Sequence, residues 1–404
     1  MLLEQVLHYN SYQSGQAAFA EMAKRLLHYR ASSLLTFLPA SDSRPLLDPV
    51  VFASLCLDSS PLPVEQGLLG YMEIESRPRS VRVRSDREGV IYLPNIGYLN
   101  TERPDADFLL LIPNDGFQFR VKSTTGEINY LFEPLILIPG TRIELSRRVP
   151  ASFYSFHAGK DGAIVDDVTA AVVKAHESQV FKAFVTLAKV YPAFIHALND
   201  VVRSIVLFRS DCHNSFSSLT AHGAAFFNVA KSANEVFFIE DILHQCGHVL
   251  FSSMTCEPDS YFTVAADRLL PHQDQRVETR SVYVVLHALF TEAAMSEGMN
   301  ECYNARVFEG QQRHKLVGRI AFIMRRFEAD IKSLTSSELL SQKGLTIIAQ
   351  FSKVFTQVYE DRKNEICNFD FSNQAYTFSS EKFLSANPRR ETSIQQTVME
   401  PNHD

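Results

Sequence analysis

Residues 240–250 read Glu-Asp-Ile-Leu-His-Gln-Cys-Gly-His-Val-Leu, and they lie within a stretch, 235–254, that has the apolar periodicity of a helix. His244 and His248 are four residues apart, so a helix places both imidazoles on one face, about one turn from each other. This spacing lets two nitrogens reach one metal ion at about 2.0–2.1 Å. It also arises by chance in a chain with 13 histidines. Spacing alone therefore leaves open two histidines that contact only backbone or solvent.

The rest of this helix is apolar, which predicts that it is buried. The side chains that cover most of its circumference are Ile242, Leu243, Cys246, Val249, Leu250, Phe251 and Met254. An unpaired buried polar group costs about 1–3 kcal/mol, and a metal ion would satisfy the two imidazoles. A second apolar helix, predicted within 278–297, carries His287 and is far enough along the chain to return past the first. His287 would complete a three-nitrogen face with open positions, and Glu292 is the alternative third ligand.

Gln245 follows the first histidine at the position where zinc peptidases of this helix type carry a glutamate. That glutamate takes a proton from the metal-bound water. A neutral amide cannot accept this proton, so Gln245 counts against hydrolysis by this route. It does not count against a metal site, because a redox metal that activates dioxygen does not need the carboxylate.

The order of elements predicts an α+β protein, in which an N-terminal helical and β-meander half packs on a mainly helical half that holds the histidines. We expect three regions, 1–150, 151–365 and a C-terminal tail, 366–404. The expected helices are 12–35, 168–198 with a break at Pro192, 235–254, 278–297, 311–334 and 339–361, and the expected strands are about five in 77–145, then 204–208 and 224–230. The last twenty or so residues lack apolar periodicity.

Composition narrows the possible partners. Lys and Arg total 39 against 46 Asp and Glu, a net charge of -7, which argues against a broad surface for nucleic acid or anionic lipid. No apolar run reaches the roughly 18 residues of a membrane-spanning helix, and the first residues have no signal-peptide pattern. Six cysteines without a CxxC pair are typical of reduced thiols. We therefore expect a soluble cytoplasmic protein without membrane or nucleic-acid partners; its oligomeric state stays open.

Several segments together resemble a known family. These are IYLPNIGYL (91–99), GAAFFN (223–228), LHQCGHVLFSSM (243–254), YVVLHALFTEAA (283–294) and GRIAFIMRRFEADI (318–331). In order and spacing they resemble the HExxH-type peptide β-hydroxylases, which are Fe(II)- and 2-oxoglutarate-dependent enzymes that modify ribosomally made peptides. The resemblance covers roughly residues 90–360, and Gln245 departs from the name-giving motif.

The resemblance implies that His244, His248 and His287 ligate Fe(II) and that 2-oxoglutarate is the cosubstrate. The distal carboxylate of 2-oxoglutarate needs a cation. Arg319 lies in an apolar stretch and is the first candidate; Arg280 and the pair Arg325 and Arg326 are the others.

His222 precedes the strand that leads to the helix of His244 and His248 (235–254), which we call the histidine helix. It is predicted to hydrogen-bond a metal ligand. The alternative is a histidine at a strand end that contacts solvent.

The expected function is hydroxylation, at Cβ, of a residue in a peptide such as a ribosomal precursor peptide. An extended peptide could pair with a free edge of the strand 224–230, unless that strand is interior. Two other functions remain open: a zinc-dependent hydrolase related to the peptidases, and an inactive relative that binds peptides.

Overall fold

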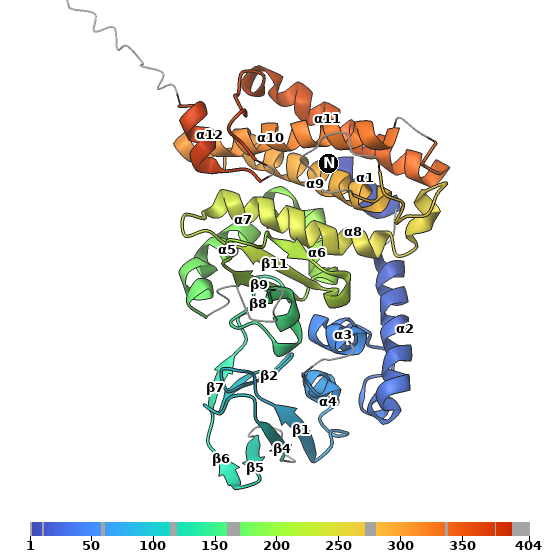
Figure 1. Cartoon of the computed structure of the whole chain (residues 1–404), viewed down its shortest axis with the longest axis vertical. Coiled ribbons are helices and arrows are strands. Elements are labelled where there is room, and N and C mark those ends of the chain that lie inside the picture. Colours follow the sequence, from blue (N-terminus) through green and yellow to red (C-terminus); the bar gives the residue numbers. More distant parts are fainter. Residues whose placement is uncertain are drawn as a thin grey trace, which may run out of the picture.

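A computed structural model describes residues 2–9, 12–57, 61–113, 119–159, 170–270, 280–335, 338–375 and 377–389. The fold is mixed α+β, as the sequence predicts. Its long axis runs from a layer of C-terminal helices, through the histidine helix and a central sheet, to two N-terminal sheets (Figure 1). Among the residues that the structure describes, no helix is long and apolar enough to cross a membrane.

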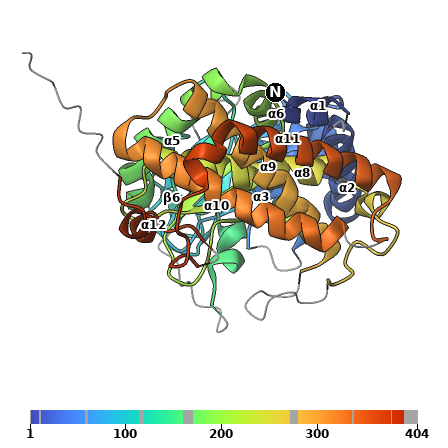
Figure 2. The ribbon, with the colours of Figure 1, turned by 90° about the horizontal axis from the view of Figure 1, so that it is seen from above.

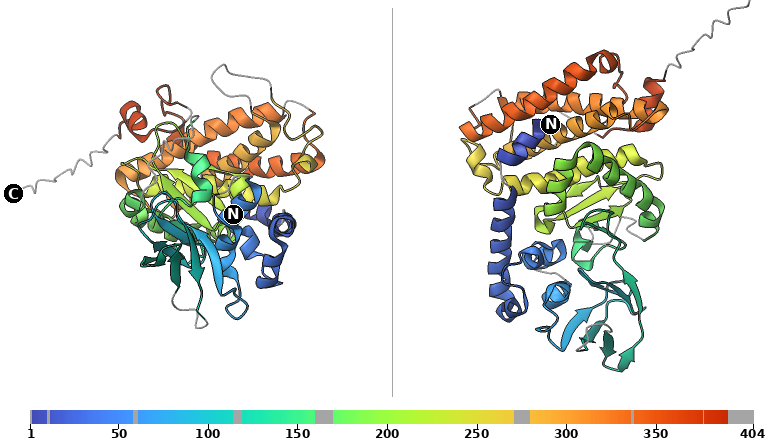
Figure 3. Two further views of the ribbon diagram at one scale, coloured as in Figure 1. Left: turned by 60° about the horizontal axis from the view of Figure 1, so that its bottom comes forward. Right: turned by 180° about the vertical axis from the view of Figure 1, so that it is seen from behind.

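Four helices precede the first strand: α1 (Leu2–Tyr9), α2 (Tyr12–Ala31), α3 (Pro49–Cys56) and α4 (Val64–Leu68). The long α2 runs beside the central and N-terminal layers, as the view from behind in Figure 3 shows. It packs on the histidine helix at Gly15, where an added Cβ would lie 1.7 Å from the carbonyl oxygen of Ser253. Only glycine permits this close approach, which fixes α2 against the central layer.

Two antiparallel sheets occupy the region where the sequence predicts a single meander of about five strands. One has the order β1-β4-β5-β6 and the other β2-β3-β7. Their strands are β1 (Ser80–Arg84), β2 (Val90–Leu93), β3 (Gly97–Asn100), β4 (Asp107–Leu111), β5 (Arg120–Ser123), β6 (Gly126–Ile128) and β7 (Leu131–Pro134). The run 90–99 divides into a hairpin because Asn95 has a φ of 62° and Gly97 a φ of 146°. Residues 114–118, which include the start of the predicted strand 117–123, lie outside the described residues.

The central sheet has the order β10-β11-β9-β8. Its strands are β8 (Glu144–Ser146), β9 (Ser204–Phe208), β10 (Phe216–Ser217) and β11 (Ala224–Asn228). Strand β9 pairs in parallel with both β8 and β11, whereas β10 is antiparallel to β11. This sheet therefore joins a strand from before residue 150 to strands that follow it. The N-terminal α1 likewise packs in the same core as the C-terminal helices.

The predicted helices of the second half are present, although α9 ends seven residues and α11 five residues beyond the predicted ends at 297 and 361. They are α5 (Ala170–Val190), α6 (Pro192–Val201), α7 (Glu235–Asp241), α8 (Gly247–Met254), α9 (Val282–Asn304), α10 (Gly310–Thr335) and α11 (Gln342–Ile366). The break at Pro192 is confirmed. Asn234 caps α7 by accepting a hydrogen bond from the backbone N–H of Phe237. Seen from above, α10 and α11 lie over α9 (Figure 2), which is buried along most of its length.

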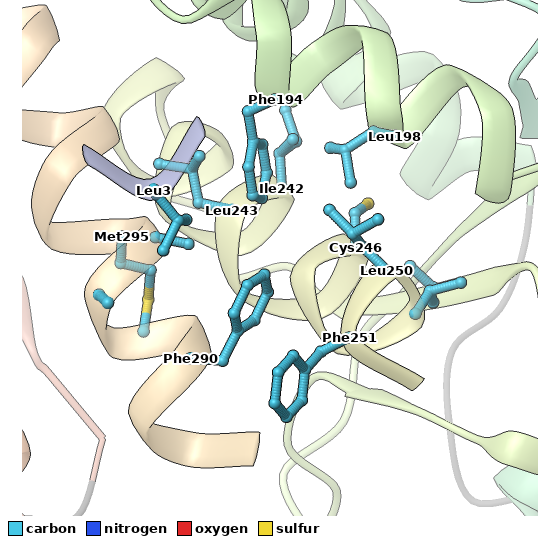
Figure 4. Packing of buried hydrophobic residues seen from close by; sticks show 14 of the residues in the cluster. Leu3, Phe194, Leu198, Ile242, Leu243, Cys246, Leu250, Phe251, Phe290 and Met295 are labelled. Atoms are coloured by element: carbon cyan, nitrogen blue, oxygen red, sulfur yellow. The ribbon is translucent and has the colours of Figure 1, made fainter. Parts of the chain in front are cut away.

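The histidine helix is continuous from α7 to α8, but its middle turn, Ile242–Cys246, is π-helical. Single π turns inside α-helices recur at functional sites. The apolar side of this segment packs against α6, α9 and α1, where Leu243, Cys246 and Phe290 lie in a continuous core (Figure 4). The polar side chains of the same segment are thereby left to face the other way.

The chain after residue 366 is folded as far as residue 389, so the prediction of a C-terminal tail over 366–404 is wrong for that part. It forms α12 (Ser380–Ala386) and packs on α10 through a small aromatic cluster centred on the fully buried Phe383. Phe322 and Phe371 belong to the same cluster. The aromatic residues are too widely spaced to give a periodic pattern, which is why the sequence does not indicate them. Residues 390–404 lie outside the described residues.

Candidate functional site

A pocket of about 790 Å³ opens beside the polar side of the histidine helix. Its walls come from the histidine helix, α9, α10, the β10–β11 region and the segment before α12. The side chains used below are Ser215, Glu240, Asp241, His244, Gln245, His248, Tyr283, His287, Arg319, Arg326 and Phe378. This volume is within the range of small-molecule sites, about 300–1,000 Å³.

The three predicted metal ligands line this pocket together. The ring centroids of His244 and His248 are 5.0 Å apart, and those of His248 and His287 are 5.5 Å apart with an interplanar angle of 17°. The Nδ1 atoms of His248 and His287 lie 3.3 Å apart. The sequence prediction that α9 returns past the histidine helix at His287 therefore agrees with the fold.

His287 sits among aromatic rings that fix its orientation. Tyr283 and Phe251 both meet its ring edge to face, with centroid distances of 4.4 and 4.8 Å. The Tyr283 hydroxyl is held in turn by Thr255, at 2.8 Å. The Nε2 atom of His287 is buried and has no hydrogen-bond partner among the described residues. A buried nitrogen without a partner is costly, and such an atom is a candidate for a ligand contact.

Burial keeps all three imidazoles neutral near neutral pH. It lowers the pKa of His248 to about 4, and the nearby Arg326 guanidinium adds to this effect. Burial also holds the pKa of His244 and of His287 well below the usual range, with the charged form of His248 as a further cause. Metal ions bind the neutral imidazole, so these histidines do not have to lose a proton before they bind a metal.

The three imidazoles are suitable metal donors, and the distance between two of their nitrogens suits a shared ion. The three rings together are not yet arranged around one point. Two nitrogens on one ion at about 2.1 Å lie roughly 3 Å apart, close to the separation of the His248 and His287 Nδ1 atoms. Yet in the part of the chain that the structure describes, no group of three or more His, Cys, Asp or Glu side chains stands ready to hold a metal. Binding on all three histidines thus requires at least one ring to rotate.

Gln245 is buried and contacts the first of these histidines. Its amide nitrogen lies 3.1 Å from Nδ1 of His244. When Nδ1 accepts that hydrogen bond, the ring proton resides on Nε2. Turning the amide by half a turn lets its oxygen accept an Nδ1 proton instead, which leaves a lone pair on Nε2 for a metal. Gln245 can therefore control which nitrogen of His244 is available, a role that does not need a carboxylate.

Arg319 lines the pocket, as its proposed role requires, but it already has an anionic partner. Its guanidinium forms an ion pair with Glu240 and lies over the ring of Phe378, 4.8 Å from the centroid. Burial lowers its pKa to about 10, so it stays charged. Any carboxylate that binds Arg319 must share the guanidinium with Glu240 or displace it.

The other predicted cations differ in position. Arg280 does not line the pocket; it donates to Asp330, with one contact of 2.9 Å. Arg326 lines the pocket and pairs with Glu292 at 3.3 Å, whereas Arg325 is exposed and lies over the ring of Phe371. Arg280 is thus unsuited to the proposed contact because it is committed elsewhere.

Glu292, the alternative third ligand, is buried behind the pocket wall. Only 1% of the residue is exposed, and it does not line the pocket. Burial raises the pKa of its carboxyl to about 8, although Arg326 opposes this. Glu292 is five residues after His287, so helical geometry places it about 140° around α9 from His287, in agreement with this position.

His222 lies outside the pocket, so its predicted contact with a metal ligand is absent. It is buried on the far side of the histidine helix, where its Nε2 atom is 2.7 Å from Nε2 of Gln16 and 3.3 Å from the hydroxyl oxygen of Ser253. Phe19 and Phe52 pack around the ring, and burial lowers its pKa to about 3. His222 is a core residue that joins α2 to α8, and the solvent-exposed alternative does not hold either.

The sequence left open whether the strand 224–230 has a free edge or is interior, and the structure shows that it is interior. Strand β11 pairs with β9 on one side and with β10 on the other. Phe226 and Phe227 are fully buried, and Asn228 holds the preceding loop through its side-chain amide, which donates to the carbonyl groups of Ser210 and His213. The two-residue β10 lies in a polar loop, where no alternating pattern indicates a strand. The free-edge model for β11 is therefore wrong.

The sequence argument did not single out five of the pocket side chains named above, which are Ser215, Glu240, Asp241, Tyr283 and Phe378. Glu240 is four residues before His244, and Asp241 four before Gln245, so the helical periodicity that placed the histidines also places both carboxylates on the pocket side. That signal was present. Phe378 had no such signal, because it depends on the tertiary packing of the segment before α12.

No known protein-family model matches the chain, and no curated protein is similar to it at a significant level. The function must therefore be argued from the site itself.

Proposed function

We propose that this chain is an Fe(II)- and 2-oxoglutarate-dependent oxygenase that hydroxylates a residue of a peptide. The observation that carries the proposal is the convergence of His244, His248 and His287, all held neutral, on one pocket of about 790 Å³. Neutral nitrogen ligands with open positions suit a metal that must also bind a cosubstrate and dioxygen. The resemblance to the peptide β-hydroxylases supports the same reaction and a peptide substrate.

The side chains around the histidines have separate tasks in this proposal. His244, His248 and His287 would hold the ion, and Gln245 would orient His244 through its amide oxygen. When bound, ferrous iron with 2-oxoglutarate and dioxygen supplies the chemistry that hydroxylates an unactivated C–H bond. Arg319 would bind the distal carboxylate of 2-oxoglutarate, with its charge kept in place by Glu240. The aromatic walls at Tyr283 and Phe378 would limit access of water.

A zinc-dependent hydrolase is the second candidate, because three histidines also suit zinc. Hydrolysis needs a base near the metal-bound water, and Gln245 cannot serve. Asp241, a carboxyl that lines the same pocket, is the residue that could replace it. This observation keeps the zinc reaction as a defined alternative to the iron reaction.

Metal content and turnover together test the proposal. The protein is purified anaerobically, stripped of metal and titrated with Fe(II) and, separately, with Zn(II). We expect one Fe(II) per chain and, once dioxygen is admitted, conversion of 2-oxoglutarate to succinate and CO2 with iron but not with zinc. Zinc binding with peptide hydrolysis would favour the hydrolase. Absence of stoichiometric binding by either metal would leave a peptide-binding protein without this catalysis.

A further inference from the structure

Asp241 is the one charged side chain of the pocket wall, within the described residues, that has no oppositely charged partner. The pocket wall carries four charged side chains, those of Glu240, Asp241, Arg319 and Arg326. Arg319 pairs with Glu240, and the Nε atom of Arg326 lies 3.3 Å from the Glu292 carboxyl behind the wall, which is an anionic partner above about pH 8. The carboxyl of Asp241 forms no such pair with a described residue.

The Asp241 carboxyl is nevertheless held in a fixed position. The hydroxyl of Ser215 donates to its Oδ2 atom at 2.7 Å, and the same hydroxyl oxygen accepts the backbone N–H of Asn228 at 2.9 Å. Only 7% of Asp241 is exposed. The residue is thus a buried carboxyl, oriented by the end of β11 and lining the cavity, rather than a mobile surface acid.

Burial of a carboxylate with one neutral hydrogen bond is unfavourable, and a neighbouring cation would relieve it. In agreement, burial raises the pKa of Asp241 to about 7, while the only opposing influence is the Ser215 hydrogen bond. Among the described residues no Lys, Arg or His forms an ion pair with this carboxyl, so a cation that compensates its ionised form would come from a ligand.

We propose that Asp241 is the specificity-determining residue of this pocket and that it binds a positively charged N–H donor, so that the peptide substrate presents a Lys or Arg side chain here. The inference rests on the proposed function in taking this pocket as the substrate site, but it does not depend on the metal. Fe(II) and a dianionic 2-oxoglutarate cancel each other's charge, so the demand for a cation at Asp241 is the same in the loaded and the metal-free protein. A guanidinium or ammonium group donates N–H bonds to a carboxylate with good geometry.

Binding of four short peptides to the metal-free protein tests this directly. The probes are acetyl-Gly-Gly-X-Gly-Gly-amides in which X is lysine, arginine, norleucine or glutamate, and affinity is measured by calorimetry at about pH 8, where Asp241 is ionised. We expect the lysine or arginine peptide to bind about tenfold or more tightly than the norleucine peptide, and the glutamate peptide to bind least. Equal affinities, or no binding by either basic peptide, would overturn the inference without the need for a variant.

Asp241→Asn locates the preference. The amide oxygen can still accept from Ser215, so the loop contact is kept while the charge is removed. We expect Asp241→Asn to abolish the preference for the basic peptides over norleucine. Asp211→Asn, the same change on an exposed loop residue, should leave the preference intact. Ser215→Ala should also retain it, because the charge remains. A preference that persists in Asp241→Asn would contradict the assignment.

The same samples separate this inference from the proposed function. A preference for basic peptides that depends on Asp241, in a protein that binds no iron, would uphold the inference and refute the oxygenase. Iron-dependent turnover of 2-oxoglutarate without a preference for basic peptides would support the oxygenase and overturn the inference about Asp241.

Discussion

The Nδ1 atoms of His248 and His287 lie 3.3 Å apart although the two residues belong to different helices. Their rings are nearly parallel, and the contact is made where α9 packs on the histidine helix just after its π turn. Two neutral imidazoles at this distance share one hydrogen bond when no ion is present, and they present two nitrogens to one ion after a small rotation. The contact therefore links helix packing to the chemistry of the pocket.

His287→Ala should lower Fe(II) affinity by orders of magnitude, because a three-ligand site that loses one nitrogen retains little chelation. Affinity is measured by competition with a chelator of known strength. His244→Ala and His248→Ala should behave alike. His196→Ala, at an exposed position on α6, is the matched control and should bind iron as the wild type does. Wild-type affinity in His287→Ala would remove this residue from the ligand set.

Arg319→Leu should raise the 2-oxoglutarate concentration needed for half-maximal turnover about 10- to 100-fold, because a charge-assisted contact to a carboxylate contributes about 1.5–3 kcal/mol. Glu240→Gln should lower that concentration, since it frees the guanidinium from its present partner. The double variant separates loss of the contact from the cost of leaving Glu240 unpaired. Arg325→Leu, which changes an exposed arginine on the same helix, is the control. The assignment requires that Arg319→Leu raises and Glu240→Gln lowers the 2-oxoglutarate concentration for half-maximal turnover. A change in the same direction in both variants would reject it.

Glu292→Gln should change how stability depends on pH. Burial raises the pKa of Glu292 to about 8 from an ordinary value of 4.5, so between these values the folded protein holds a proton that the unfolded chain has released. Stability from this group is therefore present at low pH and falls as pH rises, by at most about 1.4 kcal/mol per pH unit. The free energy of unfolding, measured by denaturant titration from about pH 5 to 9, should decline less steeply in Glu292→Gln.

The test is the difference between the wild type and Glu292→Gln in how the free energy of unfolding depends on pH, because other groups titrate in the same range. Burial lowers the pKa of His222 to about 3 and of His248 to about 4, so these histidines make stability rise with pH up to about 6.5. Their contribution is common to both proteins and cancels in the difference. Identical slopes for the wild type and Glu292→Gln would show that Glu292 is ionised in the folded state.

The sequence predicts well the features that depend on local residue patterns. Periodicity placed the histidine helix at 235–254, where the structure shows it with Asn234 as its N-cap, and Pro192 marked the break between α5 and α6. The same periodicity brought His244 and His248 to one side, and the length of the intervening chain allowed His287 to return to them.

What the sequence does not predict depends on which distant elements meet. The ion pair of Arg319 with Glu240 requires α10 to lie beside α7, and the burial of His222 requires α2 to cover α8. Strand β11 is interior only because a two-residue strand, β10, forms within a polar loop. Neither helical nor strand periodicity contains this information, since each contact joins segments whose local patterns are independent.

Gly318→Ala should loosen the segment that carries Phe378 over the pocket. An added Cβ would lie 2.3 Å from the ring of the fully buried Phe383, so the ring must move. Overpacking of this kind typically costs about 1–3 kcal/mol, and here the strain falls on α12, because the backbone of α10 is held on α9. We expect faster proteolysis within residues 377–389 and a raised requirement for 2-oxoglutarate, because Arg319 loses its contacts with Ser380 and Phe378. Fe(II) affinity should be unchanged.

Two further variants decide whether packing at Phe383 is the cause. Phe383→Ala removes the same anchor by leaving a cavity and should give the same pattern of cleavage. Lys332→Ala, at an exposed position of α10, should not. If Gly318→Ala resists protease like the wild type while Phe383→Ala is cleaved, the ring has found another position and the overpacking argument fails. If both are cleaved and iron affinity also falls, the segment before α12 supports the histidines as well as the pocket wall, because loss of one local contact would then have reached the histidine helix.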